Sequence, residues 1–374
     1  MNKLSAANID ATIPDREEMI DRVAALVPSL AQRAEQVEKT RTIHPDTVQE
    51  FWDTQLWSIM KPKRYGGLEL DYAMLVDVPD HIARGCASTS WVYANLVIHD
   101  WMLAMWPSEA QDAVWKNNPH ALMASSLIPN AGRATPVAGG YRITGRWPYC
   151  SGIDVSDWMM MAAMIEDDQS QRPIWLVVPR AEFEEIDTWH VSGLIGTGSR
   201  DVKCENVFVP EFMTLDPRMA RGGPTPGTPH NPALVYQLPV LGLFPHLLVG
   251  PMVGIAQGAY DDYVREIHER VSTYNASKLS GHTQTQMKVA EAGTLIHAAR
   301  LLAHDNIREA EHIAETGRQP TVEEKIGWRR DGAFAAQNGV KSIQILQSAI
   351  GAAGNYLSHS FQRRFRDMHA AAGQ

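Results

Sequence analysis

The sequence predicts an α+β protein with a helical N-terminal domain, a central β domain and a C-terminal helical bundle. Apolar residues recur at steps of three and four in the first and last thirds of the 374 residues, as on one face of an α-helix. Between these parts lie short apolar or alternating runs separated by turn residues, which is typical of β-strands. A segment rich in glycine and proline then divides the strands from the last helices.

The predicted N-terminal helical domain covers residues 1–120. The stretch "DREEMIDRVAALVPSLAQRAEQVEKT" keeps one apolar face, and Pro28 inside it predicts a kink or a break in the helix. Two more apolar helices are expected between residues 72 and 106. The hydroxyl-rich stretch at 88–90 is the expected cap of the second helix.

The remaining chain divides into three predicted parts. Residues 121–216 form the β domain, with a hairpin tip at Gly139 and Gly140. Residues 217–234 have too much glycine and proline for a helix or strand, and long loops of this kind often act as lids over a site. Residues 235–374 form the C-terminal bundle, whose outer faces are expected to pack on other subunits.

One segment, "LPVLGLFPHLLVGPMVGIAQGA", is long and uncharged enough to raise the question of a membrane span. Pro239, Pro245 and Pro251 interrupt it, and polar helices follow. We therefore expect a loop that enters a buried helix, with a membrane span as the minor alternative.

Composition excludes several classes of function. The net charge is −9, and basic residues are scattered among acidic ones, which argues against a nucleic-acid partner. The three cysteines, Cys86, Cys150 and Cys204, are far apart and lack CxxC spacing. This favours a reducing, cytoplasmic location without disulfides. The acidic N-terminus does not resemble a signal peptide.

Several familiar catalytic signatures are absent from the sequence. No GxGxxG follows a predicted strand, so no nicotinamide-binding module is expected. There is no P-loop, HExxH or GxSxG motif. His297 and His304 lie two turns apart on one helical face, too far to share one ion easily, and no metal site is predicted.

The chain ends in "FQRRFRDMHAAAGQ", which is unlike a frayed terminus. Phe361, Phe365 and Met368 form an apolar stripe that needs a surface to pack on. We expect this helix to be docked and to carry His369 to a defined place. The alternative is a terminal histidine that is free in solvent.

The order of helices, β domain and helical bundle resembles the acyl-CoA dehydrogenase fold. Within that fold, "ASTSWVYANLVIH", "ASSLIP", "WPYCSG", "VSGLIGTGSRDV" and "FQRRFRDMHAA" are similar to the oxygenase components of two-component flavin-dependent aromatic monooxygenases. That group includes the hydroxylases of p-hydroxyphenylacetate and of steroid-derived phenols. The dehydrogenases carry a catalytic glutamate beyond the last arginine-rich helix, where this sequence stops.

The resemblance implies a chemistry and its partners. A separate flavin reductase would supply reduced FMN or FAD, and O2 would be the co-substrate. A C4a-hydroperoxyflavin would hydroxylate or epoxidise a small aromatic substrate of the indole or phenol type. No charged pocket residue is identifiable, which favours an apolar substrate. The resemblance also implies a homotetramer.

The resemblance also implies site residues. His369 and Ser151 would be catalytic, with His369 exchanging a proton with the substrate and Ser151 or Cys150 beside flavin N5. His99, Ser125 and Trp101 would contact the substrate. The cofactor would lie against Trp91, Ser125, Ser126, Leu127, Trp147, Tyr149, Cys150, Ser151, Gln347, Ser348, His369 and Ala370.

Simpler interpretations compete with these roles. Trp91 and Trp147 are also typical of core rings, and His99 of a hydrogen-bonded core histidine. Arg363, Arg364 and Arg366 suit either flavin phosphate or acidic residues across a subunit boundary. Two other functions stay open: an acyl-CoA dehydrogenase with Glu291 or Glu309 as its base, or a non-catalytic flavin-binding helical protein.

Overall fold

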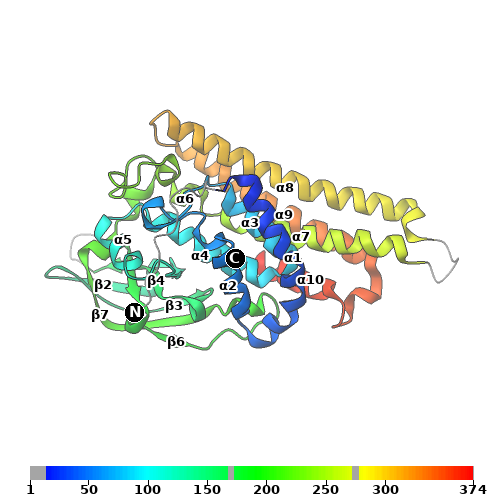
Figure 1. Ribbon diagram of the computed structural model, residues 1–374, viewed down its shortest axis with the longest axis horizontal. Coiled ribbons are helices and arrows are strands. Elements are labelled where there is room, and N and C mark those ends of the chain that lie inside the picture. Colours follow the sequence, from blue (N-terminus) through cyan, green and yellow to red (C-terminus); the bar gives the residue numbers. More distant parts are fainter. Residues whose placement is uncertain (1–13, 167–171, 272–277, 374) are drawn as a thin grey trace, which may run out of the picture.

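The structure is a computed structural model that describes residues 14–166, 172–271 and 278–373. The β-sheet lies at one end of the molecule, and long helices extend from it to the other end (Figure 1). Among the described residues, the order of helices, sheet and helices agrees with the prediction.

From residue 14 on, where the described part of the chain begins, five α-helices precede the sheet: α1 Arg16–Thr40, α2 Pro45–Asp53, α3 Met74–Gly85, α4 Ala87–Leu103 and α5 Ser108–Trp115. Helix α1 runs through Pro28 without a break, so the predicted split is wrong. A proline removes only one backbone hydrogen bond, and the buried face of α1 offsets that loss. Helix α4 begins one residue before the predicted cap cluster. Ser90 in that cluster donates to the Pro79 carbonyl, which ties α4 to α3.

The central sheet has the strand order β6-β7-β3-β2-β4-β5-β8, and β1 pairs with β4. The predicted hairpin is confirmed, because Val137 pairs with Gly140 and Gly139 takes the left-handed φ of 79° that favours glycine. The strands are β1 Met123–Ser126, β2 Gly132–Val137, β3 Gly140–Cys150, β4 Trp158–Ile165, β5 Pro173–Pro179, β6 Glu184–Ile186, β7 Arg200–Pro210 and β8 Thr214–Leu215.

The C-terminal helices are α6 Val240–Leu243, α7 His246–Glu269, α8 Thr283–Glu315, α9 Val322–Ile350 and α10 Ser360–Ala371. The segment Val240–Glu269 is long and apolar enough to cross a membrane, but 72% of its apolar window is buried inside the protein. Helix α7 packs on α3, α4, α8 and α9. It is the buried core helix that its sequence predicts.

The glycine- and proline-rich segment after β8 is attached to the helical domain. Asn231 donates to the Ala104 carbonyl and to the Gln111 side chain, and the Gly227 amide donates to the Met105 carbonyl. These buried contacts hold the segment against the corner between α4 and α5. Its predicted role as a lid stays a prediction.

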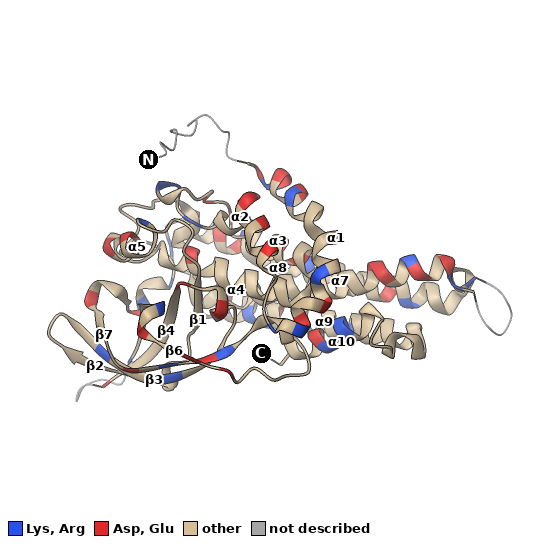
Figure 2. Ribbon diagram, turned by 60° about the horizontal axis from the view of Figure 1, so that its bottom comes forward, with Lys and Arg blue, Asp and Glu red and all other residues tan. Residues whose placement is uncertain are grey.

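The C-terminal helix α10 is docked, as its apolar stripe predicts. Phe361, Asp367, Met368 and Ala371 are buried, and the end of the chain lies between the β domain and the bundle (Figure 1). Acidic and basic side chains are interspersed along the bundle helices (Figure 2).

Candidate active site

The site begins where α4 meets β1. His99 of α4 is fully buried, and its Nδ1 lies 2.8 Å from the carbonyl oxygen of Met123 in β1. A carbonyl can only accept, so Nδ1 carries the proton. Burial lowers the pKa of His99 to about 4, which keeps the ring neutral near pH 7. Nε2 is then a hydrogen-bond acceptor, and it has no partner among the described residues.

A second polar group without a partner lies on the same strand. The hydroxyl of Ser126 is buried and has no hydrogen-bond partner among the residues that the structure describes. Ser125 is half-buried and points to the opposite face of the strand, because side chains alternate along β1. Leu127 is partly buried against the core. The segment "ASSL" thus presents hydroxyls to both sides of the sheet.

The end of β3 places Ser151 beside α4. Tyr149 has a left-handed φ of 64°, and its ring is 59% exposed, whereas Ser151 is buried. Gly152 also has a positive φ, and a Cβ there would lie 2.7 Å from the Val92 side chain of α4. The end of β3 therefore lies against α4, the helix that also carries Trp91. Only glycine at 152 permits this close approach.

Ser151 is held by a loop between β6 and β7, which we call the 187–199 loop. The hydroxyl oxygens of Ser151 and Ser199 are 2.8 Å apart, and those of Ser199 and Thr197 are 2.7 Å apart. The Thr197 hydroxyl donates to the Leu194 carbonyl at 2.9 Å. The Gly152 amide donates to the Thr197 carbonyl, so side chain and backbone both fix the end of β3 on this loop.

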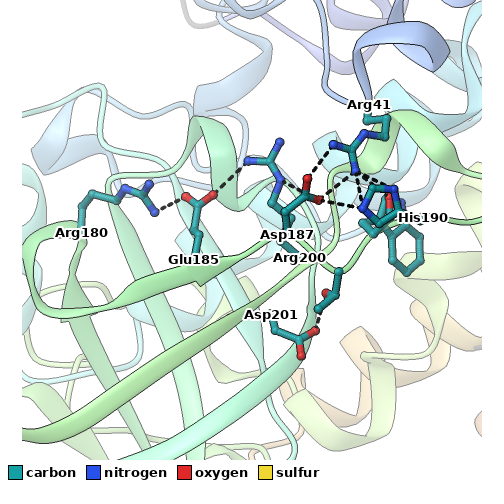
Figure 3. A network of polar contacts seen from close by, with 9 residues as sticks. Arg41, Arg180, Glu185, Asp187, His190, Arg200 and Asp201 are labelled. Carbon is teal, nitrogen blue, oxygen red and sulfur yellow. Dashed lines mark hydrogen bonds and ion pairs between the residues drawn. The ribbon is translucent and has the colours of Figure 1, made fainter.

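The start of the 187–199 loop is fixed by a network of charges (Figure 3). Both carboxylate oxygens of Asp187 accept from Arg41 at 2.7 and 2.8 Å, and Arg41 also donates to the Trp189 carbonyl. Arg200 pairs with Glu185 on the neighbouring strand at 3.0 Å. Ion pairs that are partly open to water contribute little stability each, but together these define where the loop starts.

Helix α10 holds the middle of the 187–199 loop. The buried carboxylate of Asp367 accepts from the Leu194 amide at 2.6 Å, and Arg366 donates to the Ser192 carbonyl at 2.6 Å. Burial raises the pKa of Asp367 to about 6. A Cβ on Gly193 would lie 2.3 Å from the Arg366 carbonyl oxygen, so loop and helix are in direct contact.

The arginines of α10 have partners within the chain. Arg363 and Arg366 pair with Glu38 of α1, and Arg364 pairs with Asp262 of α7. Neither sequence alternative, flavin phosphate or acids across a subunit boundary, accounts for these contacts. The arginines dock α10 on its own subunit.

His369 lies on the open face of α10. Its Nδ1–H donates to the Phe365 carbonyl at 2.8 Å, and the two rings lie 4.2 Å apart. Nε2 is 3.4 Å from the amide nitrogen of Gln344. The imidazole is exposed although the helix is docked. Ala370 beside it is half-buried and faces Gly193.

Three predicted site residues are enclosed and satisfied by the protein itself. Trp147 is fully buried and donates to the Ala162 carbonyl, and Trp101 is fully buried and donates to the Val235 carbonyl. Cys150 is fully buried, with its sulfur 3.3 Å from the Trp147 carbonyl oxygen. Their polar groups are engaged inside the protein, and their predicted contacts with flavin or substrate stay predictions.

Two further predicted residues lie away from the β domain. Gln347 and Ser348 are at the end of α9, where the Ser348 carbonyl accepts from Lys288 at the start of α8. The end of α9 lies on the side of the molecule opposite to the sheet (Figure 1). The structure does not bring these residues together with His99 and Ser151.

Thr197, Ser199 and Asp367 are site residues that the sequence did not single out by role. They lie in "VSGLIGTGSRDV" and "FQRRFRDMHAA", two of the segments that carry the resemblance. Only the fold shows that these segments meet. The two glutamates of the dehydrogenase alternative are engaged elsewhere: Glu291 pairs with Lys341, and Glu309 accepts from Trp328.

The residues present fit an aromatic cofactor and substrate. Two buried polar groups without partners among the described residues, the Nε2 acceptor of His99 and the hydroxyl of Ser126, suit a ligand with N–H or O–H groups. In the described part of the chain, no group of three His, Cys, Asp or Glu residues could hold a metal ion.

Comparisons with known proteins show the family of this chain. The N-terminal domain of acyl-CoA dehydrogenase matches residues 14–117, and its C-terminal domain matches residues 246–373. The chain is 32% identical to a pigment production hydroxylase of Rhodococcus sp., over 94% of this chain and 91% of that protein. It is 31% identical to the oxygenase component of an FADH2-dependent resorcinol hydroxylase of Rhizobium sp., over 99% and 93%.

A solved structure is similar along nearly the whole chain. The 3-HSA hydroxylase of Rhodococcus sp. RHA1 superposes with a TM-score of 0.92 at 30% identity, and the match covers 96% of this chain and 93% of that one. The fold, the docked tail and the relatives lead to one conclusion. The chain belongs to the oxygenase components of two-component flavin-dependent monooxygenases, which share the acyl-CoA dehydrogenase fold.

Proposed function

We propose that this oxygenase component hydroxylates or epoxidises a small, electron-rich phenol or indole. Reduced flavin and the hydroxylation of aromatic compounds follow from the family, and the two-component system implies a separate flavin reductase. FADH2 is the first cofactor form to test, because the resorcinol hydroxylase is named for it. Reduced FMN remains the alternative.

The acceptor on His99 is the observation that supports this substrate class. Its Nδ1–H is committed to the Met123 carbonyl, so Nε2 can only accept while the ring is neutral. A buried acceptor without a partner costs about 1–3 kcal/mol, which a ligand O–H or N–H would recover. A phenol or an indole carries such a donor on an otherwise apolar ring. A free carboxylate would bring another acceptor without a matching cation.

The other roles follow from position. Ser151 and Ser126 would bind polar edges of the flavin, and Ser125 a polar edge of the flavin or the substrate. Trp91 and Leu127 would add apolar surface that excludes water. The exposed imidazole of His369 would exchange a proton with the substrate when the site closes over it. The reduced flavin supplies the electrons that activate O2.

We further propose a cytoplasmic homotetramer. Several large apolar side chains on the outer faces of α8 and α9 are exposed in the single chain: Met287, Leu301, Val322, Ile326 and Phe334. Exposed apolar groups on long helices favour burial against another subunit. A role for Gln347 and Ser348 in cofactor binding would require such a neighbour, because they lie far from the β domain of their own chain.

The proposal is tested by mixing the protein with a flavin reductase, NADH and FAD, and offering a panel of phenols and indoles. We expect a hydroxylated or epoxidised product from at least one ring, with less H2O2 per NADH than without substrate. His369→Ala should increase the amount of H2O2 formed per NADH consumed and decrease the amount of product. The matched control, His312→Ala, changes an exposed histidine of α8 and should leave the ratio of H2O2 to NADH unchanged. Unchanged product formation in His369→Ala would remove the role of that residue.

One further assay and the same aromatic panel separate the two other candidate functions. Reduction of bound FAD by an acyl-CoA, without reductase or O2, would indicate a dehydrogenase. Binding of reduced flavin with H2O2 as the only product from every aromatic compound would indicate a non-catalytic flavin carrier. Either result would contradict the proposed function.

A further inference from the structure

The hydrogen bonds around Ser151 have a fixed direction. We assign the one proton of the Thr197 hydroxyl to the Leu194 carbonyl oxygen, which can only accept and which also accepts from the Thr197 amide at 3.1 Å. In the 2.7 Å contact between Thr197 and Ser199, Thr197 must therefore accept and Ser199 must donate. Ser199 has then used its own proton, so in its 2.8 Å contact with Ser151 it accepts and Ser151 donates. Both lone pairs of the Ser151 hydroxyl are then left to accept from a ligand.

These three hydrogen bonds form a relay from Ser151 through Ser199 and Thr197 to the Leu194 carbonyl, and the Leu194 end is held in place. The Leu194 amide donates to the buried carboxylate of Asp367, and the Leu194 carbonyl also accepts from the Trp189 ring nitrogen at 3.1 Å. Thr197 and Ser199 are 1% and 3% exposed, so water cannot readily reverse the order of donors. Gly193 packs directly against α10, where a Cβ would lie 2.3 Å from the Arg366 carbonyl oxygen.

This direction matters for a flavin because one ring atom changes its hydrogen-bonding character with redox state. The N5 atom of the oxidised ring has a lone pair and accepts, whereas N5 of the reduced ring carries a proton and donates. A serine fixed as an acceptor can bind the donating form. Against the oxidised form, two acceptors would face each other, unless the relay broke one of its buried hydrogen bonds.

We propose that Thr197 and Ser199 are positioning residues that make Ser151 an acceptor and thereby make the site select reduced over oxidised flavin. This inference rests on the proposed function, because it requires that a flavin binds beside Ser151. Thr197 and Ser199 are buried behind Ser151 and would not need to touch the ring. Each acts through the proton of Ser151.

The test is the ratio of dissociation constants for oxidised and reduced FAD, measured by aerobic and anaerobic titration of the full chain. Thr197→Val is isosteric but has no hydroxyl, so the Ser199 proton can turn toward Ser151 and free the Ser151 proton for the ligand. Ser199→Ala frees that proton directly. In both variants, we expect the ratio to fall about tenfold, which corresponds to about 1.4 kcal/mol.

Thr197→Ser is the matched control, because it keeps the hydroxyl and should keep the wild-type ratio. Simple loosening of the loop would weaken both redox forms and leave the ratio unchanged, and that result would overturn the inference. So would an unchanged ratio with unchanged affinities. If one variant failed to fold, as judged by circular dichroism, the other would decide. Wild-type protein that bound neither form would instead overturn the proposed function.

Discussion

The burial of a neutral His99 has a measurable consequence for stability. The folded chain holds its pKa at about 4, against 6.5 for an ordinary histidine. Between these pH values, the unfolded chain binds a proton that the folded chain does not, so acidification favours unfolding. The cost is absent above pH 6.5, grows as the pH falls, and levels off below pH 4 at about 3 kcal/mol.

His99→Asn tests this cost, because the amide does not titrate and can still donate to the Met123 carbonyl. At pH 5, the proton linkage amounts to about 2 kcal/mol. Between pH 7.5 and pH 5, we therefore expect the wild type to lose about 2 kcal/mol more than the variant does. The assay is urea unfolding followed by circular dichroism at several pH values.

Comparison with an exposed histidine makes the result specific. His312→Asn in α8 should follow the wild-type pH dependence, since both curves contain the same buried histidine. If the unfolding free energies of the wild type and of His99→Asn fell equally between pH 7.5 and pH 5, the His99 ring would be protonated in the folded state as readily as in the unfolded chain. The buried acceptor that supports a phenol or indole substrate would then not exist.

Three other substitutions test the framework of the site. In the wild type, the raised pKa of Asp367 makes the folded protein less stable as the pH rises from about 4 to about 6. Asp367→Asn does not titrate and escapes this loss. Its unfolding free energy minus that of the wild type should therefore increase over that pH range by up to about 3 kcal/mol. The Lys61 ammonium lies 3.8 Å from the buried carboxylate of Asp100, the residue after His99 on α4. Lys61→Met leaves this carboxylate without its cation and should cost about 3 kcal/mol in thermal or urea unfolding, with partial recovery when Asp100→Asn is added. Gly193→Ala should displace α10 and speed amide exchange in that helix, whereas Gly327→Ala, where a Cβ meets open space, should not. Equal exchange in the two glycine variants would contradict the contact between loop and helix.

Much of the fold could be predicted because its signals are local. Helical and strand periods differ along the chain, and the apolar stripe of Phe361, Phe365 and Met368 predicts a docked tail whatever it docks on. The hairpin at Gly139 follows from turn chemistry alone. Pro28 was misleading, because a long helix with a buried face tolerates the loss of one hydrogen bond.

The details of the site could not be predicted because they depend on contacts between distant segments. In the sequence, Trp147 could be a ring that lines a pocket. In the fold, its ring packs directly on Gly132, where a Cβ would lie 2.0 Å from it. The relay through Thr197 and Ser199 exists only because the 187–199 loop meets the end of β3. Sequence placed His369 on a docked helix, but the rotation of that helix, which leaves the imidazole exposed, is set by tertiary packing.

The most direct test of the account follows oxygen into the product. The chain, a flavin reductase, NADH and FAD would react with isotopically labelled O2 in the presence of the best substrate of the phenol and indole panel. We expect the new oxygen on the ring to carry the label and to come from O2 rather than water. Labelled H2O2 alone, with every aromatic compound recovered unchanged, would contradict the proposed function.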